Sequence, residues 1–125
     1  MNRQILKEQV LFEIVKSISK LGTCSRSKVG AIIVRDGRII STGHNGSPPG
    51  EPHCLDVGCT MVAGHCVATT HAESNAIAFA ARSGISTLGA TIYVTGWITG
   101  GDLGICPACE KLAKSAGIVK TVIVR

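Results

Sequence analysis

Two short stretches decide how this chain folds and what it can bind: residues 71–77 read HAESNAI and residues 106–109 read CPAC. The first opens a predicted helix over 71–83, whose small apolar residues recur at helical spacing and suit close contact with a sheet. The second opens a predicted helix over 106–115, with Pro107 in the first turn, where proline is tolerated. Both helix starts therefore carry side chains that can bind a metal ion.

The segments around these two helices predict a mixed sheet. Apolar residues at steps of three and four predict an N-terminal helix, and two apolar runs around an Asp-Gly turn predict a hairpin. The first hairpin strand is almost continuously apolar, which predicts burial on both of its faces. The expected elements are a helix over 5–21, hairpin strands over 29–34 and 38–43, and strands over 91–95 and 119–125. This alternation favours one α/β domain over residues 1–125, with helices on the faces of the sheet.

Residues 43–70 form a long stretch without helical or strand periodicity that is rich in glycine, proline, histidine and cysteine. Few compact domains keep a loop of this length unless it serves a function or is held by a staple. Most of the chain's metal-binding side chains lie in this loop or just before it: Cys24, Cys54, Cys59, Cys66, His44, His53 and His65. The loop is therefore a second candidate region for metal binding.

Composition limits the classes of partner. The chain has 125 residues and a formal net charge of +5, which favours an anionic partner. The charge fits a small phosphorylated molecule as well as it fits a polymer, but no block of Lys and Arg and no basic-aromatic stripe suggests a nucleic-acid groove. Nucleic acid is therefore the less favoured partner.

Targeting signals are not visible in the sequence. No apolar run reaches the roughly 18 residues of a membrane span, and charges interrupt the apolar pattern at the N-terminus. We therefore expect a cytoplasmic protein without a membrane partner. In a reducing compartment, six cysteines indicate metal binding or catalysis, and a secreted disulfide framework is the disfavoured alternative.

One histidine and two cysteines at the helix starts, His71, Cys106 and Cys109, suit a catalytic zinc ion. Three protein ligands leave one of the four tetrahedral positions of zinc open, which is typical of catalytic sites. Water in that position has its pKa lowered from about 15.7 towards about 7. The first turn of a helix also favours cysteine thiolates, because free N–H groups and the helix dipole stabilise negative charge there.

Glu73 is the candidate for proton transfer. It lies two residues after His71 and cannot share its direction on the helix, but it can lean over the open metal position and act as general acid and base. His-Ala-Glu alone is a weak pattern, and Cys-x-x-Cys alone would also suit a redox pair or half of a zinc ribbon. The two patterns together are the signature of zinc-dependent deaminases that act on nucleobases.

The resemblance extends beyond this signature. From about residue 20 to its end, the chain resembles the deoxycytidylate deaminase family of the cytidine deaminase-like fold. The matching segments are 27–34 (SKVGAIIV), 43–48 (GHNGSP), 65–67 (HCV), 71–77, 90–95 (ATIYVT) and 106–109. The resemblance implies a three-layer α-β-α fold with a mixed sheet, a homo-oligomer, and zinc-dependent hydrolysis of a cytosine nucleotide, most simply dCMP to dUMP with release of ammonia.

The resemblance also implies residue roles. The zinc ligands would be His71, Cys106 and Cys109, and Glu73 would carry the proton. Substrate contacts would come from the Asn45 side chain to the sugar, from the Ala72 N–H to the pyrimidine carbonyl, and from Arg26, Ser27 and Lys28 to the phosphate. For Arg26 and Lys28, a solvated sheet edge is an equally good interpretation.

Some positions depart from the family pattern. His44 stands where the family usually has tyrosine, Ile105 stands where it usually has proline, and segment 96–104 is longer than usual. The sequence also stops at Arg125, where relatives commonly continue. These departures keep open a free nucleoside, a modified cytosine or another aminated heterocycle as substrate. They also keep open a non-catalytic zinc-stapled binding module, whereas editing of a base within RNA or DNA is less favoured.

The remaining cysteines form a possible second site. Some members of the family carry an additional structural zinc in this region, and a metal would explain how the long loop stays ordered. The preferred ligands are Cys24, Cys54 and Cys66, with His65 or Cys59 as the fourth. The spacings fit no ribbon template, and the alternative is that these cysteines pack as small apolar side chains.

Overall fold

The computed structural model describes residues 2–62, 65–66, 70–98 and 104–125. The elements are α1 (Arg3–Ser19), β1 (Ser27–Arg35), β2 (Arg38–His44), α2 (Cys54–Val57), β3 (Met61–Val62), β4 (His65–Cys66), α3 (Ala72–Arg82), β5 (Thr91–Ile98), α4 (Pro107–Ser115) and β6 (Lys120–Ile123). Among the described residues, no helix has both the length and the apolar character that crossing a membrane requires.

The central sheet is mixed, as predicted. Its strand order is β2-β1-β5-β6, with β1 antiparallel to both neighbours and β5 parallel to β6. The predicted hairpin is confirmed, because Asp36 and Gly37 both adopt positive φ angles, 53° and 74°, as the tight turn between twisted strands requires. The central strand β1 is buried along Val29–Val34, as its apolar run predicts.

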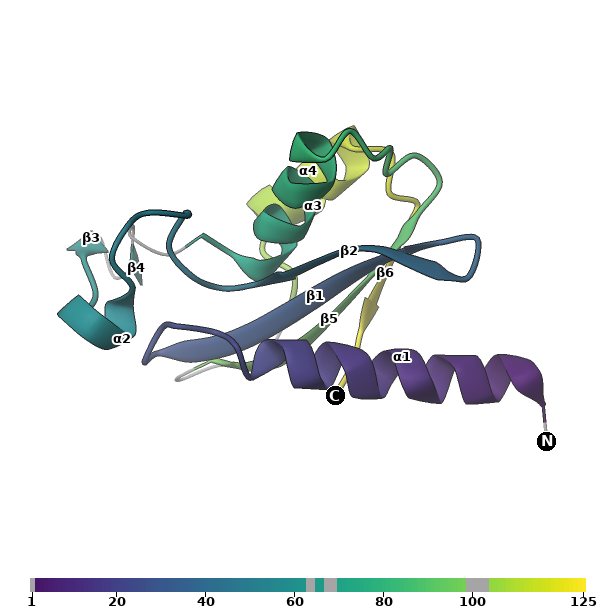
Figure 1. Ribbon diagram of the computed structural model, residues 1–125, viewed down its shortest axis with the longest axis horizontal. Coiled ribbons are helices and arrows are strands. Elements are labelled where there is room, and N and C mark those ends of the chain that lie inside the picture. The colour runs from purple at the N-terminus through teal and green to yellow at the C-terminus, as the bar shows by residue number, and fades with distance from the viewer. Residues whose placement is uncertain (1, 63–64, 67–69, 99–103) are drawn as a thin grey trace.

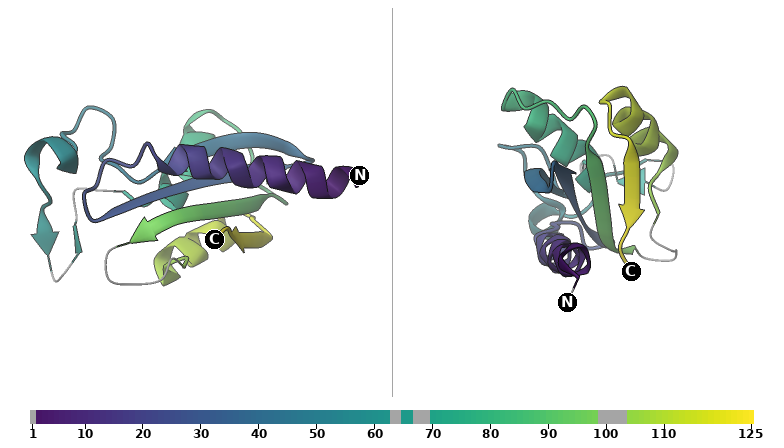
Figure 2. Two further views of the ribbon diagram at one scale, coloured as in Figure 1. Left: turned by 90° about the horizontal axis from the view of Figure 1, so that it is seen from below. Right: turned by 90° about the vertical axis from the view of Figure 1, so that its right-hand side faces the viewer.

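Helices cover both faces of the sheet, which confirms the predicted three layers. Figure 2 (right) shows α1 on one side and α3 with α4 on the other. Successive residues of β1 pack against helices on opposite faces of the sheet. Ile32 packs with Val15 of α1, whereas Ile33 packs with Ala76 of α3. All four side chains are completely buried.

Close packing places the start of α3 directly on β2. A Cβ atom at Gly43 would lie 2.5 Å from the Ala72 carbonyl oxygen and 2.5 Å from the Ala76 nitrogen. Only glycine therefore permits this contact. As a result, the end of β2 and the first turn of α3 are in direct backbone contact.

Several element boundaries differ from the sequence expectation. Helix α1 begins at Arg3 because the Asn2 side chain accepts a hydrogen bond from the Gln4 N–H at 2.8 Å and caps the helix. Strand β5 continues to Ile98, because Gly96, with φ of 140°, keeps its pairing with β1. The segment expected as a loop over 96–104 is thus partly strand, and residues 99–103 lie outside the described part.

The long segment after β2 is also more ordered than expected. It contains the short helix α2 and the antiparallel pair β3–β4, with Met61 opposite Cys66. Figure 1 shows these three elements together at one end of the molecule, beyond the end of the sheet.

Candidate metal centre

The structure brings His71, Cys106 and Cys109 together at two neighbouring helix starts. His71 is the N-cap residue of α3 and Cys106 is the N-cap residue of α4. His71 Nδ1 lies 3.3 Å from Cys109 Sγ and 3.4 Å from Cys106 Sγ, and all three ligand atoms lie within 4.8 Å of one another. Ligands of a tetrahedral zinc ion lie roughly 3.3–3.8 Å apart, so this group fits the ion.

Burial of this group is uneven. Cys109 is 2% exposed and Cys106 is half-buried, whereas His71 is exposed. Within the described residues, the group contains three possible ligands and no fourth. An ion held here would therefore be backed by the protein on one side and accessible on the other, which suits a catalytic site.

Glu73 is buried beside this group, with 4% of its surface exposed. Burial raises the pKa of the Cys109 thiol, and the negative charge of Glu73 raises it further, whereas hydrogen bonds from Cys106 and Ser74 act in the opposite direction. The Ser74 hydroxyl lies 3.6 Å from Cys109 Sγ. Glu73 therefore lies beside Cys109, where its charge and a side-chain hydrogen bond both act on the thiol.

The predicted substrate residue Asn45 is 3% exposed and holds the start of β1. Its Oδ1 accepts a hydrogen bond from the Val29 N–H at 2.9 Å. Its Nδ2 donates to the Ser27 carbonyl oxygen at 2.9 Å and lies 3.1 Å from the Ser27 hydroxyl. The contact of Asn45 with the sugar stays a prediction. In this structure the Asn45 side-chain amide is already hydrogen-bonded to Ser27.

The three candidate phosphate residues point in different directions. Arg26 is exposed, and Ser27 and Lys28 are half-buried on opposite faces of β1, as successive strand residues must be. The Lys28 ammonium donates to the Lys20 carbonyl oxygen at 3.4 Å, towards the end of α1. Ala72, the candidate for the pyrimidine carbonyl, is completely buried as the first residue of α3, where N–H groups lack helical partners.

A second group of possible ligands consists of Cys24, Cys54 and Cys59, whose sulfur atoms lie within 4.8 Å of one another. Cys24 Sγ and Cys59 Sγ are 3.9 Å apart. Of the residues predicted for this site, the structure thus brings three together. The backbones of His65 and Cys66 form β4, but their side chains lie outside the described part of the structure.

Thr23 connects this second group to the segment after β2, a role that the sequence analysis missed. Its N–H donates to the Asn45 carbonyl oxygen at 3.1 Å, and its carbonyl oxygen accepts from the Leu55 N–H at 2.9 Å. Its hydroxyl lies 2.8 Å from His53 Nδ1. The position of Thr23 next to Cys24 is the one sequence signal that could have indicated this role.

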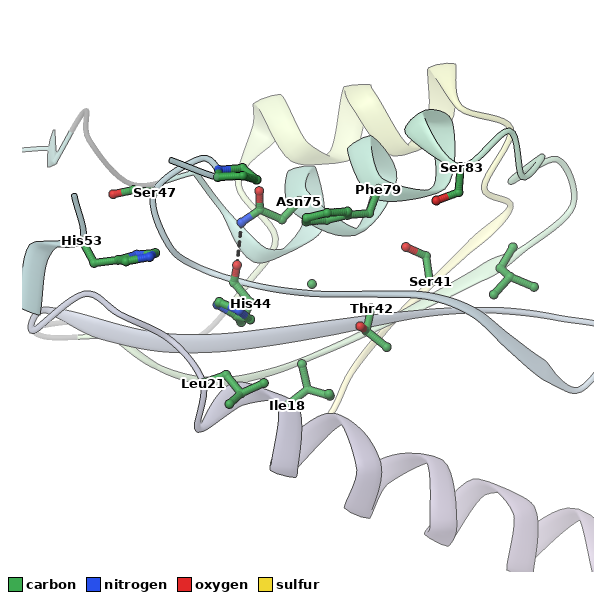
Figure 3. A pocket seen from close by; sticks show the side chains of 13 residues that line it. Ile18, Leu21, Ser41, Thr42, His44, Ser47, His53, Asn75, Phe79 and Ser83 are labelled. Atoms are coloured by element: carbon green, nitrogen blue, oxygen red, sulfur yellow. Dashed lines mark hydrogen bonds between the residues drawn. The ribbon is translucent and has the colours of Figure 1, made fainter. Parts of the chain in front are cut away.

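A separate cavity of about 620 Å³ lies along the outer edge of β2, between α1 and α3. Figure 3 shows His44, Asn75, Phe79 and Ile18 around it. None of the three ligands of the first metal group lines this cavity. The cavity is therefore distinct from the candidate metal centre. The two are connected through α3, since Asn75 lines the cavity and His71 is the N-cap residue of the same helix.

Known proteins resemble this chain in both sequence and fold. The chain is 49% identical to ComE operon protein 2 of Bacillus subtilis (strain 168) over 100 residues, which cover 80% of this chain and 49% of that protein. It is 35% identical to the deoxycytidylate deaminase of Enterobacteria phage T4 over 155 aligned residues, covering 94% of this chain and 77% of that one. The chain thus spans about half of the first of these relatives.

A solved structure agrees with these matches. The dCMP deaminase of cyanophage S-TIM5, crystallised in complex with dCMP and dUMP, superposes with a TM-score of 0.77 at 29% identity, covering 98% of this chain and 82% of that one. This match confirms the cytidine deaminase-like fold. Residues 6–125 also match the family described as the cytidine and deoxycytidylate deaminase zinc-binding region. With three possible metal ligands at two helix starts and a buried glutamate beside them, the chain belongs to this zinc-binding deaminase family.

Proposed function

We propose that this chain hydrolyses the exocyclic amine of dCMP, giving dUMP and ammonia. The observation that carries the proposal is the grouping of His71, Cys106 and Cys109 at two helix starts, with Glu73 buried beside them. The choice of nucleotide is supported by the phage T4 relative, which is a deoxycytidylate deaminase, and by the cyanophage enzyme crystallised with dCMP and dUMP.

The residues divide the chemistry between them. His71, Cys106 and Cys109 hold the zinc ion, which supplies a water molecule activated as a nucleophile near neutral pH. Glu73 takes one proton from the attacking water and delivers it to the pyrimidine ring nitrogen N3, and then takes the remaining proton from the C4 hydroxyl group and delivers it to the amine. The C4–N bond breaks, ammonia leaves, and C4 keeps the oxygen as a carbonyl.

Recognition of the nucleotide is assigned to the residues around the end of β2 and the start of β1. Asn45 contacts the sugar and the Ala72 N–H contacts the pyrimidine carbonyl. Arg26 and Ser27 bind the phosphate, and Lys28 contributes positive charge from the opposite face of the strand. The net charge of +5 supports an anionic substrate.

The second cysteine group is proposed to hold a structural zinc ion. Cys24, Cys54 and Cys59 provide three ligands, and His65 or Cys66 provides the fourth. The short elements α2, β3 and β4 support this assignment, since each is too small to be stable without additional links.

The chain is further proposed to fold as a single domain over residues 1–125 and to form a homo-oligomer in the cytoplasm. Exposed apolar side chains support self-association, among them Ile5, Leu6 and Val10 of α1. Light scattering of the purified protein would give the number of subunits, and a monomer at micromolar concentration would contradict the oligomer.

A substrate panel tests the proposed reaction. Purified, zinc-loaded protein should release ammonia from dCMP with a kcat/KM well above that for deoxycytidine or cytosine. A strong preference for the nucleoside or the base would overturn the choice of dCMP but keep the chemistry. A protein that binds zinc and releases ammonia from no aminated base would instead be a zinc-stapled binding module.

A further inference from the structure

Asn75 joins the catalytic helix to the segment that leads into Asn45. Its Nδ2 donates a hydrogen bond of 2.6 Å to the carbonyl oxygen of His44, the last residue of β2 (Figure 3). Helix α3 also carries Glu73, two residues before Asn75. A single side-chain bond thus links the helix of the proposed proton carrier to the residue that precedes the proposed sugar contact.

The other bonds of this segment lead elsewhere. The Asn45 N–H donates to the Val29 carbonyl oxygen of β1, and Gly46 and Thr70 exchange two backbone hydrogen bonds of 3.1 and 2.8 Å. These contacts fix the segment to the sheet and to the chain before His71. Among the hydrogen bonds of the described residues, the Asn75 bond ties the segment to the body of α3.

We infer that Asn75 is a positioning residue, which sets the distance between Asn45 and Glu73 and so aligns the pyrimidine ring with the proton carrier. The inference rests on the proposed function and deepens it. Asn75 itself touches no reacting atom. Misplacement of about 1 Å between substrate and catalytic groups is enough to reduce a rate by on the order of 100-fold.

The fold should persist when the Asn75 side chain is removed. Asn75 and His44 both line the cavity of about 620 Å³, so a water molecule can replace the lost donor to the His44 carbonyl oxygen. The backbone pairing of Gly46 with Thr70 does not involve Asn75. Loss of the bond therefore relaxes the geometry without leaving a buried acceptor unsatisfied.

Ser41 provides a matched control. Its hydroxyl donates to the Ala76 carbonyl oxygen at 2.6 Å, so it also joins β2 to α3 through a half-buried side-chain bond of the same length. It does not contact the segment from His44 to Gly46. Ser41→Ala therefore removes a comparable link between the same two elements while leaving the proposed sugar contact in place.

The experiment compares Asn75→Ala, the isosteric Asn75→Asp and Ser41→Ala with the parent protein. Zinc content and Tm should stay near the parent values in all three variants. For dCMP, both Asn75 variants should lose roughly 10- to 100-fold in kcat/KM, mainly in kcat, because the nucleotide still binds but meets Glu73 at the wrong distance. Ser41→Ala should stay within about twofold of the parent, since it does not affect this alignment.

A second measurement does not depend on turnover. Backbone hydrogen exchange at Gly46 and Thr70 should accelerate in Asn75→Ala and remain unchanged in Ser41→Ala. Equal kinetics in the Asn75 and Ser41 variants, unchanged exchange, or loss of zinc or of the fold in the Asn75 variants would each overturn the inference. A parent protein that deaminates nothing refutes the proposed function instead, and the exchange rates then decide whether Asn75 positions the segment.

Discussion

The two groups of possible metal ligands differ in what holds them in place. His71, Cys106 and Cys109 lie at the starts of α3 and α4, which pack on the sheet through completely or almost completely buried residues such as Ala72, Ala76 and Ala113. Cys24, Cys54 and Cys59 lie at the end of the molecule where α2, β3 and β4 sit beyond the sheet (Figure 1).

Side-chain burial around the second group is low. The large apolar residues of its short elements are exposed: Leu55, Val57, Met61 and Val62. The first group is thus supported by the hydrophobic core, whereas the second group has little apolar burial around it. From this comparison we expect a metal at the first group to serve chemistry and a metal at the second group to serve local folding.

The largest expected effect concerns chemistry at the first group. Glu73→Gln keeps the size of the side chain but removes its ability to take a proton, so kcat for dCMP should fall by roughly 10²- to 10⁴-fold. Zinc content, measured by atomic absorption, should be unchanged, because Glu73 is not one of the three ligands. A Glu73→Gln protein with parental activity would exclude this residue as the proton carrier.

Removal of one ligand from each group contrasts the two sites directly. Cys54→Ala should lose one zinc ion per chain and become sensitive to limited proteolysis between residues 54 and 62, because little apolar burial remains to hold α2 and β3. Cys109→Ala should lose the other zinc ion and all activity while keeping this segment resistant. Equal protease resistance of the parent and Cys54→Ala would show that the second group needs no metal.

A substitution at the contact between β2 and α3 tests whether the core builds the first group. Gly43→Ala places a methyl group 2.5 Å from backbone atoms of α3, which should destabilise the protein by about 1–3 kcal/mol and shift the helix that starts at His71. Chemical denaturation measures the loss. Gly104→Ala is the matched control, since a Cβ there meets no atom within 4 Å, and a similar loss in both variants would refute the packing argument.

The smallest expected effect is on the outer surface of α4. Lys114 and Glu110 form an ion pair of 3.4 Å, but their side chains are 74% and 52% exposed. Lys114→Ala should change the free energy of unfolding by less than about 0.5 kcal/mol, although α4 carries the proposed metal ligand Cys109 in its first turn. A larger change, or loss of zinc, would mean that the surface of α4 supports the first group more than its buried face does.

Local sequence predicted the first group well because each of its parts is encoded within a few residues. His71 and Glu73 belong to one helix start, Cys106 and Cys109 belong to another, and Pro107 marks the first turn between them. Gly37 likewise marks the hairpin through a local turn. Such features need no knowledge of distant contacts, so pattern and spacing suffice.

Other features depend on contacts between residues far apart in the sequence, so local pattern and spacing could not predict them. Cys24 lies near Cys59 in a region where the neighbouring Thr23 bonds both Asn45 and Leu55, and no periodicity encodes that arrangement. The extension of β5 past Gly96 follows from pairing with β1, which brings Gly96 too close to Lys28 and Val29 for any side chain, whereas in the sequence alone the glycine suggests a loop. Tertiary pairing overrode local preference in both cases.

The tight turn at Asp36 and Gly37 also governs the order in which the sheet assembles. β1 and β2 are neighbours along the chain and can pair as soon as both are made. The other edge of β1 pairs with β5, which begins only at Thr91. Until then Val29–Val34 presents an apolar, unpaired edge that invites association with other nascent chains.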